Sequence, residues 1–243
     1  MKPQITEIVA AVGAIVRAVE SAVGRRLLVI VDGLDRVDVE QGRQIFAESQ
    51  VLDAPSCHLI YVIPAHLYYS PYLNLTKQIF KSVYALPNVK LRSRDGARHE
   101  AGYDFMREVV DKRVASVGLA RGELFEPEAL DQLAAHSGGM LREYIRLIQS
   151  AVLEATQKRS ATVTAANAQA AVDALRRDYM AGITPPLLAE LVEVQRKGMP
   201  SGVQMGDVAL QNQYVLCQTN RDVWYEVHPV IESYVREAWA KGS

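Results

Sequence analysis

Two aspartates follow a continuous apolar run near the start of the chain. Residues 27–31 read Leu-Leu-Val-Ile-Val, and Asp32, Gly33, Leu34 and Asp35 come directly after them. An apolar run without polar alternation is typical of a strand buried on both faces of a parallel sheet. Ligands of open α/β sheets bind at the carboxyl ends of such strands. We therefore expect Asp32 to hold Mg²⁺, directly or through water, and Asp35 to orient or polarise an attacking water.

A simpler interpretation of the same residues stays open. Gly33 would make a turn after the strand, and the carboxylate of Asp32 would cap the helix that follows. In that case neither Asp32 nor Asp35 would have a chemical role.

A second candidate for chemistry is an arginine that follows a glycine pair. Ser137, Gly138 and Gly139 break the chain, and a helix over 141–158 then carries Arg142 in its first turn. Arginine suits phosphate because its planar fork bonds two oxygens at once and keeps its charge. The alternative is a solvated helix arginine that pairs with Glu143.

The elements that position these residues change character along the chain. Up to residue 93 helices alternate with apolar strands, which indicates an α/β layered domain. The expected elements there are helices over 5–23 (ended by Gly24), 39–49 and 73–84, and strands over 27–31, 58–63 and 87–92. From residue 102 to 178 only helices are expected, over 103–117, 127–136, 141–158 and 164–179.

The last part of the sequence predicts two helices, a hairpin and a final helix. The helices cover 187–197, 203–211 and 231–239, and the strands 214–218 and 223–227 enclose a polar turn at 219–222. This order resembles a winged-helix module with the hairpin as its wing. A small α+β cap of another type is the alternative.

Taken in order, these pieces resemble STAND-type ATPases, a branch close to the AAA+ P-loop ATPases that includes the NACHT group. Asp-Gly-Leu-Asp at 32–35 looks like their Walker B motif, and 60–64 resembles the sensor 1 strand. Residues 137–142 resemble the start of the sensor 2 helix, where an arginine reaches the nucleotide phosphates. Residues 224–229 sit where such proteins often carry a winged helix. The resemblance covers nearly the whole chain, and its most specific motif is 32–35.

The resemblance implies a fold class, a domain division and ligands. The fold class is α/β: a partial P-loop NTPase parallel sheet, an all-helical lid and a small winged-helix-like α+β module. The implied parts are an ATPase core over 1–100, a lid over 101–182 and the module over 183–243. ATP and Mg²⁺ are the implied ligands of the full-length protein, with Asp32 on the metal, Asp35 on the water and Arg142 sensing the γ-phosphate.

Two departures from the family pattern limit what this chain can do. The sequence contains no G-x-x-x-x-G-K-[ST] loop, so it lacks the backbone cradle and the lysine that hold phosphates. Pro64-Ala65 occupies the place of a polar sensor, and His66 is the nearest candidate; a turn histidine is the alternative. We expect a C-terminal piece of a longer ATPase that is inactive as an isolated chain.

Composition narrows the class of protein. The 243 residues are 49% hydrophobic with a net charge of −1, which indicates a globular protein. No stretch approaches the ~18 apolar residues of a membrane span. The apolar segment 5–23 is interrupted by Glu7, Arg17 and Glu20 and does not fit a signal peptide. Cys57 and Cys217 form no metal-type pair, so a reduced cytoplasmic setting is expected.

Three functions from different classes stay open at this point. The first is an ATP-dependent regulatory switch that acts on a protein partner or a second copy of itself. The second is a pseudo-ATPase scaffold for protein assembly. The third, a winged-helix nucleic-acid binder, is disfavoured because residues 185–243 hold five basic against seven acidic residues. We expect Trp224 and Tyr225 to pack on the last helix, with His228 at the start of that helix. The sequence does not place an arginine finger acting in trans; the candidates are Lys77, Lys81, Arg92 and Arg94.

Overall fold

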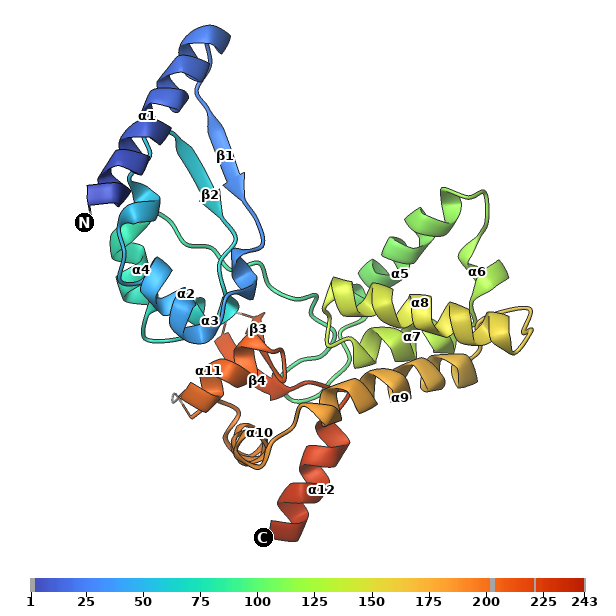
Figure 1. The fold of residues 1–243 in the computed structure, drawn as a ribbon. Helices are drawn as coiled ribbons and strands as arrows, with labels where there is room; N and C mark the ends of the chain where they lie inside the picture. Colours follow the sequence, from blue (N-terminus) through green and yellow to red (C-terminus); the bar gives the residue numbers. More distant parts are fainter. Residues whose placement is uncertain (1–2, 202–203, 221, 243) are drawn as a thin grey trace. The chain divides into compact units, whose positions relative to one another are not determined.

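The computed structural model describes residues 3–201, 204–220 and 222–242 and has a mixed α/β fold (Figure 1). It divides into two compact units, Met1–Ala85 and Leu86–Ser243, which are treated separately below. Val203, expected to start a helix, and Arg221, expected in the hairpin turn, lie outside the described residues.

The first unit contains a two-stranded parallel sheet with helices before, between and after its strands. The strands pair in register, from Leu28 opposite His58 to Val31 opposite Tyr61. Gly24 ends the first helix with φ 68°, as the sequence predicts. The elements are α1 (Pro3–Val23), β1 (Leu28–Val31), η1 (Leu34–Arg36), α2 (Val39–Phe46), η2 (Val51–Asp53), β2 (His58–Tyr61), α3 (Ala65–Tyr68) and α4 (Leu73–Ile79).

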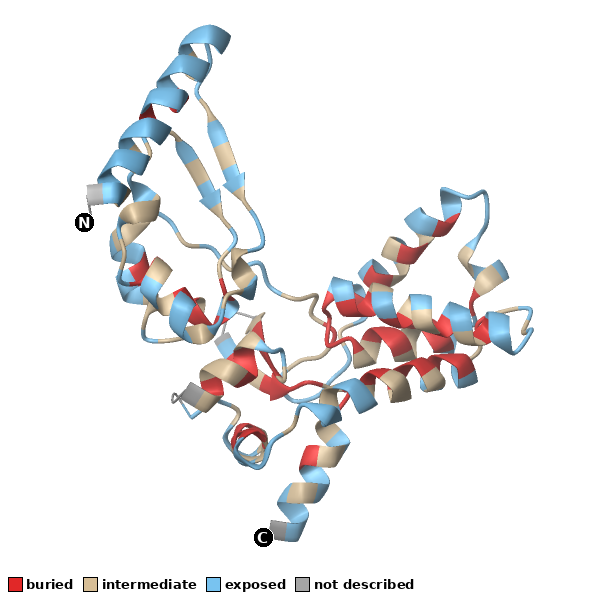
Figure 2. Cartoon of the chain, in the orientation of Figure 1, coloured by how far each residue is buried: buried red, intermediate tan, exposed pale blue. Residues whose placement is uncertain are grey.

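One face of this sheet is exposed, which corrects the expectation that the strands are buried on both faces. Ile30 is 62% exposed and Ile60 is 50% exposed, and the register places both on the same face with Leu28. The physical reason is that the helices of the first unit leave these side chains largely uncovered. A second apolar row is exposed on α1 (Figure 2); it consists of Ile8, Val12, Ile15, Val19 and Val23.

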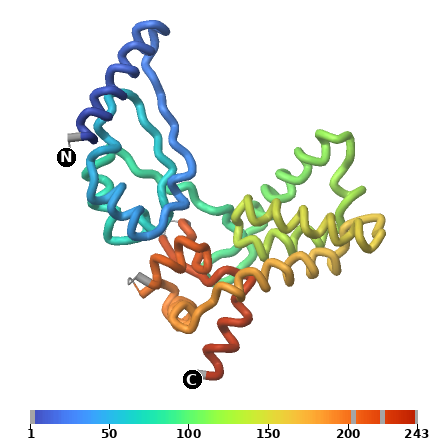
Figure 3. Tube along the Cα trace, viewed as in Figure 1, coloured from blue at the N-terminus to red at the C-terminus, as the bar shows by residue number. Residues whose placement is uncertain are grey.

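The second unit is helical and then ends in a hairpin and one more helix. Helices α7, α8 and α9 lie side by side and bury the apolar faces that the sequence predicts (Figures 1 and 3). The elements are α5 (Glu100–Ala115), α6 (Arg121–Leu124), α7 (Pro127–His136), α8 (Leu141–Gln157), α9 (Ala165–Ala181), α10 (Pro185–Lys197), α11 (Gln204–Gln211), β3 (Val215–Asn220), β4 (Asp222–Val227) and α12 (Glu232–Gly242).

The third strand expected over 87–92 does not form among the described residues. Its backbone groups pair with other elements instead: Val89 N donates to the carbonyl of Gly139 at 2.9 Å, and the carbonyl of Leu91 accepts from His99 N at 2.9 Å. Arg92 makes only an isolated antiparallel bridge with Arg98. The segment is therefore an extended strand-like piece that lies against helices.

The C-terminal hairpin is antiparallel, with Val215 opposite Val227 and Cys217 opposite Tyr225. The chain after it is anchored by His228, which is fully buried and stacks on Tyr179 of α9 with ring centroids 4.6 Å apart. The expectation that His228 begins the last helix is wrong: α12 begins at Glu232, because the ring of His228 packs against α9 instead.

Candidate functional site

The two candidate carboxylates lie at the carboxyl end of β1. Gly33 has φ 87°, a conformation that suits glycine, and it turns the chain sharply into η1. The turn leaves Asp32 exposed and places Asp35, which is half-buried, in the middle of η1. Asp32 Oδ1 accepts a hydrogen bond from Gly33 N at 2.7 Å, which holds the carboxylate against the turn.

β2 ends at the same edge of the sheet as β1, because the two strands are parallel. Val62 N donates to the carbonyl of Val31 at 3.0 Å, so the ladder continues to the residue next to Asp32. Pro64 then begins α3, on which His66 is fully buried. A side-chain carbon added at Gly42 of α2 would lie 3.4 Å from the imidazole of His66, so this ring is packed against α2.

The candidate phosphate arginine lies at the start of α8. Gly138 and Gly139 have φ 61° and 81°, and the helix begins two residues after the second of them. Arg142 is exposed, and among the described residues it makes no ion pair. Glu143 is instead paired with Arg146, whose Nη1 donates to it at 2.8 Å. The helix thus presents Arg142 to solvent, with the neighbouring carboxylate already engaged.

The structure brings some of the predicted residues together. Asp32 and Asp35 share one edge of the sheet in the first unit, and His66 follows the neighbouring strand of the same unit. Arg142 belongs to the second unit.

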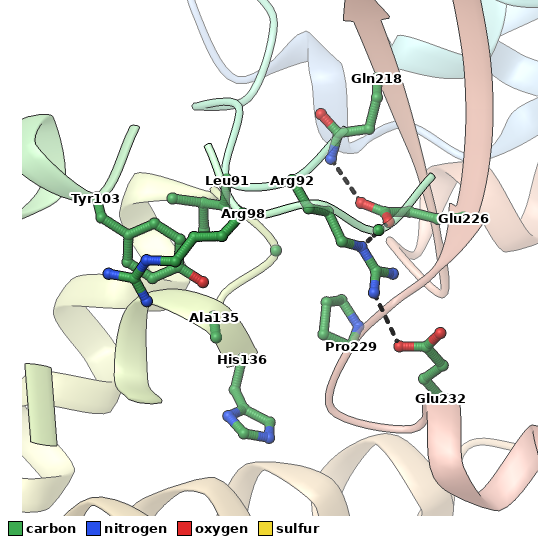
Figure 4. Close-up of a pocket in the computed structure, with 12 residues that line it drawn as sticks. Leu91, Arg92, Arg98, Tyr103, Ala135, His136, Gln218, Glu226, Pro229 and Glu232 are labelled. Atoms are coloured by element: carbon green, nitrogen blue, oxygen red, sulfur yellow. Dashed lines mark hydrogen bonds and ion pairs between the residues drawn. The ribbon is translucent and has the colours of Figure 1, made fainter. Parts of the chain in front are cut away.

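A further group of charged residues, which the sequence pattern did not single out, lines a cavity of about 290 Å³ in the second unit (Figure 4). Arg92 points at two carboxylates: its Nε donates to Glu226 Oε2 at 2.5 Å and its Nη1 donates to Glu232 Oε2 at 3.2 Å. Gln218 Nε2 donates to the other oxygen of Glu226 at 2.8 Å. The segment that precedes α5 is thereby tied to the hairpin and to α12.

Burial controls the charges in this group. Burial lowers the pKa of Arg92, but attraction to Glu226 and Glu232 outweighs it, so the pKa is raised overall. Burial raises the pKa of Glu226, and attraction to Arg92 offsets this only in part. The guanidinium of Arg92 is thus held charged, whereas burial makes the carboxylate of Glu226 costly to ionise. The strength of this ion pair therefore depends on its surroundings.

Sequence reasoning missed this group for a clear reason. Arg92 appeared only as one of several basic candidates for an arginine finger or its equivalent, and its partners lie 134 and 140 residues away. One signal was present: Glu226 is the single charged residue within the otherwise apolar and aromatic run Val223–Val227.

Two deeply buried polar side chains of the second unit, His228 and Glu143, each have an atom without a hydrogen-bond partner among the described residues. Val230 N donates to Nδ1 of His228 at 3.2 Å, which leaves Nε2 of this ring without a partner among the described residues. Burial, and to a lesser extent His136, lowers the pKa of His228 to about 3. With its pKa lowered this far, His228 is a neutral ring at physiological pH. Oε2 of Glu143 is likewise buried and unpartnered within the described part of the chain.

The described residues contain no cluster of three or more His, Cys, Asp or Glu side chains arranged to hold a metal ion. No helix of the described ranges is both long enough and apolar enough to span a bilayer.

Comparisons with known proteins give only distant similarities. No protein-family model and no curated protein matches the sequence. Among solved structures, a RuvB point variant from Thermotoga maritima is 17% identical with a TM-score of 0.45, over 95% of this chain and 74% of that one. The ORC2 protein of Aeropyrum pernix, in ADPNP–ADP complexes, is 14% identical with a TM-score of 0.41, over 98% and 71%. Similarities at this level assign neither a function nor a ligand to this chain.

Proposed function

We propose that residues 1–243 form the C-terminal portion of an ATP-dependent regulatory ATPase, with the phosphate-binding loop supplied by a segment outside these residues. The observation that carries the proposal is the Asp32–Gly33–Leu34–Asp35 turn. It places two carboxylates within four residues at the carboxyl end of a parallel strand, where ligands of α/β sheets bind. The glycine at φ 87° is what allows the chain to present both.

The donor set suits Mg²⁺. This ion is usually held by one or two carboxylates together with water and phosphate oxygens, and Asp32 offers an exposed carboxylate at the sheet edge. Bound there, Mg²⁺ would neutralise charge on the phosphates. Asp32 would hold the ion, and Asp35, half-buried one turn further on, would accept a hydrogen bond from the attacking water and orient it.

Arg142 is proposed to sense the γ-phosphate. Its exposure, its place in the first turn of a helix and the engagement of Glu143 with Arg146 leave its guanidinium available for an anion. His66 would act as a sensor only if it left its packed position against Gly42. The helices from α5 to α9 would form the lid, and the helix–helix–hairpin–helix order at the end of the chain supports a winged-helix-like module.

The proposed setting is cytoplasmic, and the proposed output is contact with a protein partner or a second copy of the chain. An assembly scaffold that has lost ATP chemistry is the second candidate function. The absence of a G-x-x-x-x-G-K-[ST] loop from the 243 residues favours it if no other segment supplies that loop.

Hydrolysis assays separate the two functions. The longest natural reading frame that contains these residues is assayed with ATP and Mg²⁺, beside Asp35→Asn and Arg142→Gln. We expect Asp35→Asn to lower kcat by about 100-fold or more, because a positioned acid–base group contributes that much. Asp53→Asn, an exposed carboxylate of η2 before β2, is the matched control and should leave kcat unchanged. No hydrolysis by the folded wild-type protein would leave the scaffold function, and equal non-zero rates in all variants would contradict the role of Asp35.

A further inference from the structure

The segment Leu86–His99, here called the strap, opens the second unit and lies against three elements that are distant in sequence. Its first attachment is to the start of α8. Val89 N donates to the carbonyl of Gly139 at 2.9 Å. A side-chain carbon at Gly139 would lie 1.9 Å from the carbonyl oxygen of Val89, so only glycine permits this approach. The strap is therefore in backbone contact with the loop that presents Arg142.

The second attachment is to the start of α5. A side-chain carbon at Gly102 would lie 1.8 Å from the carbonyl oxygen of Lys90, and Nδ1 of His99 lies 3.2 Å from the same oxygen. Leu91 is buried beside them. This end of the strap is fixed by backbone contacts and packing.

The third attachment is to the hairpin module and rests on one side chain. Arg92 donates to Glu226 of β4 and to Glu232 of α12, and Figure 4 shows its guanidinium between the two carboxylates. The hairpin also touches the α8 loop directly. A side-chain carbon at Gly138 would lie 2.2 Å from Leu216 Cδ1 of β3.

The two consecutive glycines thus face different elements, Gly138 the hairpin and Gly139 the strap. Arg92 joins those two elements to each other, so the α8 loop, the strap and the hairpin form a closed ring of contacts. A shift of the strap must move the α8 loop, because no space separates the backbone of Gly139 from that of Val89. The contact of Gly138 is with the end of the Leu216 side chain, which packs the hairpin against the same loop.

We propose that this ring mechanically couples the start of α8, and with it Arg142, to the β3–β4 hairpin, with Arg92 as its releasable link. The coupling is a property of the second unit that exists without nucleotide; its use to relay nucleotide state rests on the proposed function. Arg92 is the releasable part because its side chain is 31% exposed, whereas Gly139 and Val89 are held backbone against backbone. Loosening Arg92 should therefore free both the hairpin and the α8 loop.

Amide hydrogen exchange of the full chain without nucleotide tests the coupling. In Arg92→Gln we expect exchange to rise roughly 10-fold in two places, the hairpin strands and the amides of Gly139–Tyr144, because a charge-assisted contact is lost. Arg236→Gln is the matched control: it removes another arginine from Glu232, at 2.6 Å, but does not touch the strap. It should leave Gly139–Tyr144 unchanged. If Arg92→Gln does not fold, Glu232→Gln makes the same test.

The reverse experiment uses the other side of the ring. Coupling is reciprocal, so Gly139→Ala should raise exchange in Val215–Thr219 of the hairpin. Gly122→Ala is the control, because nothing lies within 4 Å of a side-chain carbon at Gly122. Faster exchange in the hairpin alone for Arg92→Gln, with Gly139–Tyr144 as in wild type, would overturn the coupling. So would unchanged hairpin exchange in a folded Gly139→Ala. Both results are independent of ATP, so failure of the proposed ATPase function leaves this test intact.

Discussion

The two units of this chain use their apolar residues differently. In the second unit the apolar faces of α7, α8 and α9 meet one another, and Leu133, Tyr144 and Val172 are completely buried. In the first unit the apolar residues of the sheet alternate between half-covered and exposed, and among the described residues of α1 only Val16 is a buried large apolar side chain. The first unit does bury Phe46 and Leu67, but it leaves one face of its sheet and one row of α1 exposed.

The difference has a physical consequence. A two-stranded sheet is marginal by itself, and parallel sheets are normally covered on both faces. The exposed rows on the sheet and on α1 therefore leave the first unit short of the burial that stabilises a domain. This shortfall supports the proposal that a segment outside these residues completes the first unit.

The largest expected effect follows from separating the units. Residues 86–243 should fold alone and unfold in one urea transition, with a stability on the order of 5–15 kcal/mol. Residues 1–85 should show no cooperative transition and should bind a hydrophobic dye, because their sheet face is open. Circular dichroism and dye fluorescence measure both. A sharp transition for residues 1–85 would remove the contrast.

Truncating an apolar side chain should lower the free energy of unfolding by different amounts in the two units. Leu133→Ala removes a side chain that is 0% exposed and should lower the free energy of unfolding by about 2–5 kcal/mol. Ile30→Ala removes one that is 62% exposed and should cost less than about 0.5 kcal/mol. Urea melts of the full chain make the comparison. Similar losses for both would mean that the sheet face is covered in solution.

The second unit should also lose stability in mild acid. The folded pKa of His228 is lowered to about 3, below its unfolded value near 6.5, so the unfolded chain takes up a proton first. The stability that the neutral, buried ring of His228 contributes is complete above pH 6.5 and is lost as the pH falls. The expected loss between pH 7 and pH 5 is about 2 kcal/mol.

The control for this loss is a variant that keeps a ring against Tyr179. His228→Phe should flatten the pH dependence over the same interval, whatever its effect on absolute stability. An unchanged slope in that variant would show that another group is responsible.

Helix caps should have smaller effects than the buried Leu133 and His228. Thr164 caps α9 by accepting from Asn167 N, and Asp38 caps α2 by accepting from Gln41 N at 2.8 Å. Thr164→Ala should lower the free energy of unfolding in the main transition by about 1 kcal/mol. Asp38→Ala should leave that transition in place, because it acts in the other unit. Equal shifts of one shared transition would show that the two units unfold together.

Much of the fold follows from local sequence signals. The helices of the second unit appear within a few residues of their expected bounds because their apolar spacing and caps act locally, as Thr164 does at the start of α9. The prediction of a strand over 87–92 is wrong because the same apolar pattern fits a strand and an extended segment that packs against other elements. Periodicity does not report that Gly102 and Gly139 open room for its backbone.

The candidate sites likewise differ in whether local sequence signals predict them. The turn at Asp32–Asp35 could be predicted because strand, glycine and carboxylates are adjacent in sequence. The contact of Arg92 with Glu226 and Glu232 could not, because it depends on how distant elements pack. The exposure of Ile30 also escaped prediction, since an apolar run does not reveal what covers it.

The most direct test of the central claim is a calorimetric titration of ATP with Mg²⁺ into the protein expressed from its longest natural reading frame, beside Asp32→Ala. We expect binding that weakens at least about 10-fold in the variant, because the carboxylate that holds the ion is gone. Absence of binding to a folded wild-type protein, or equal binding by the variant, would contradict it.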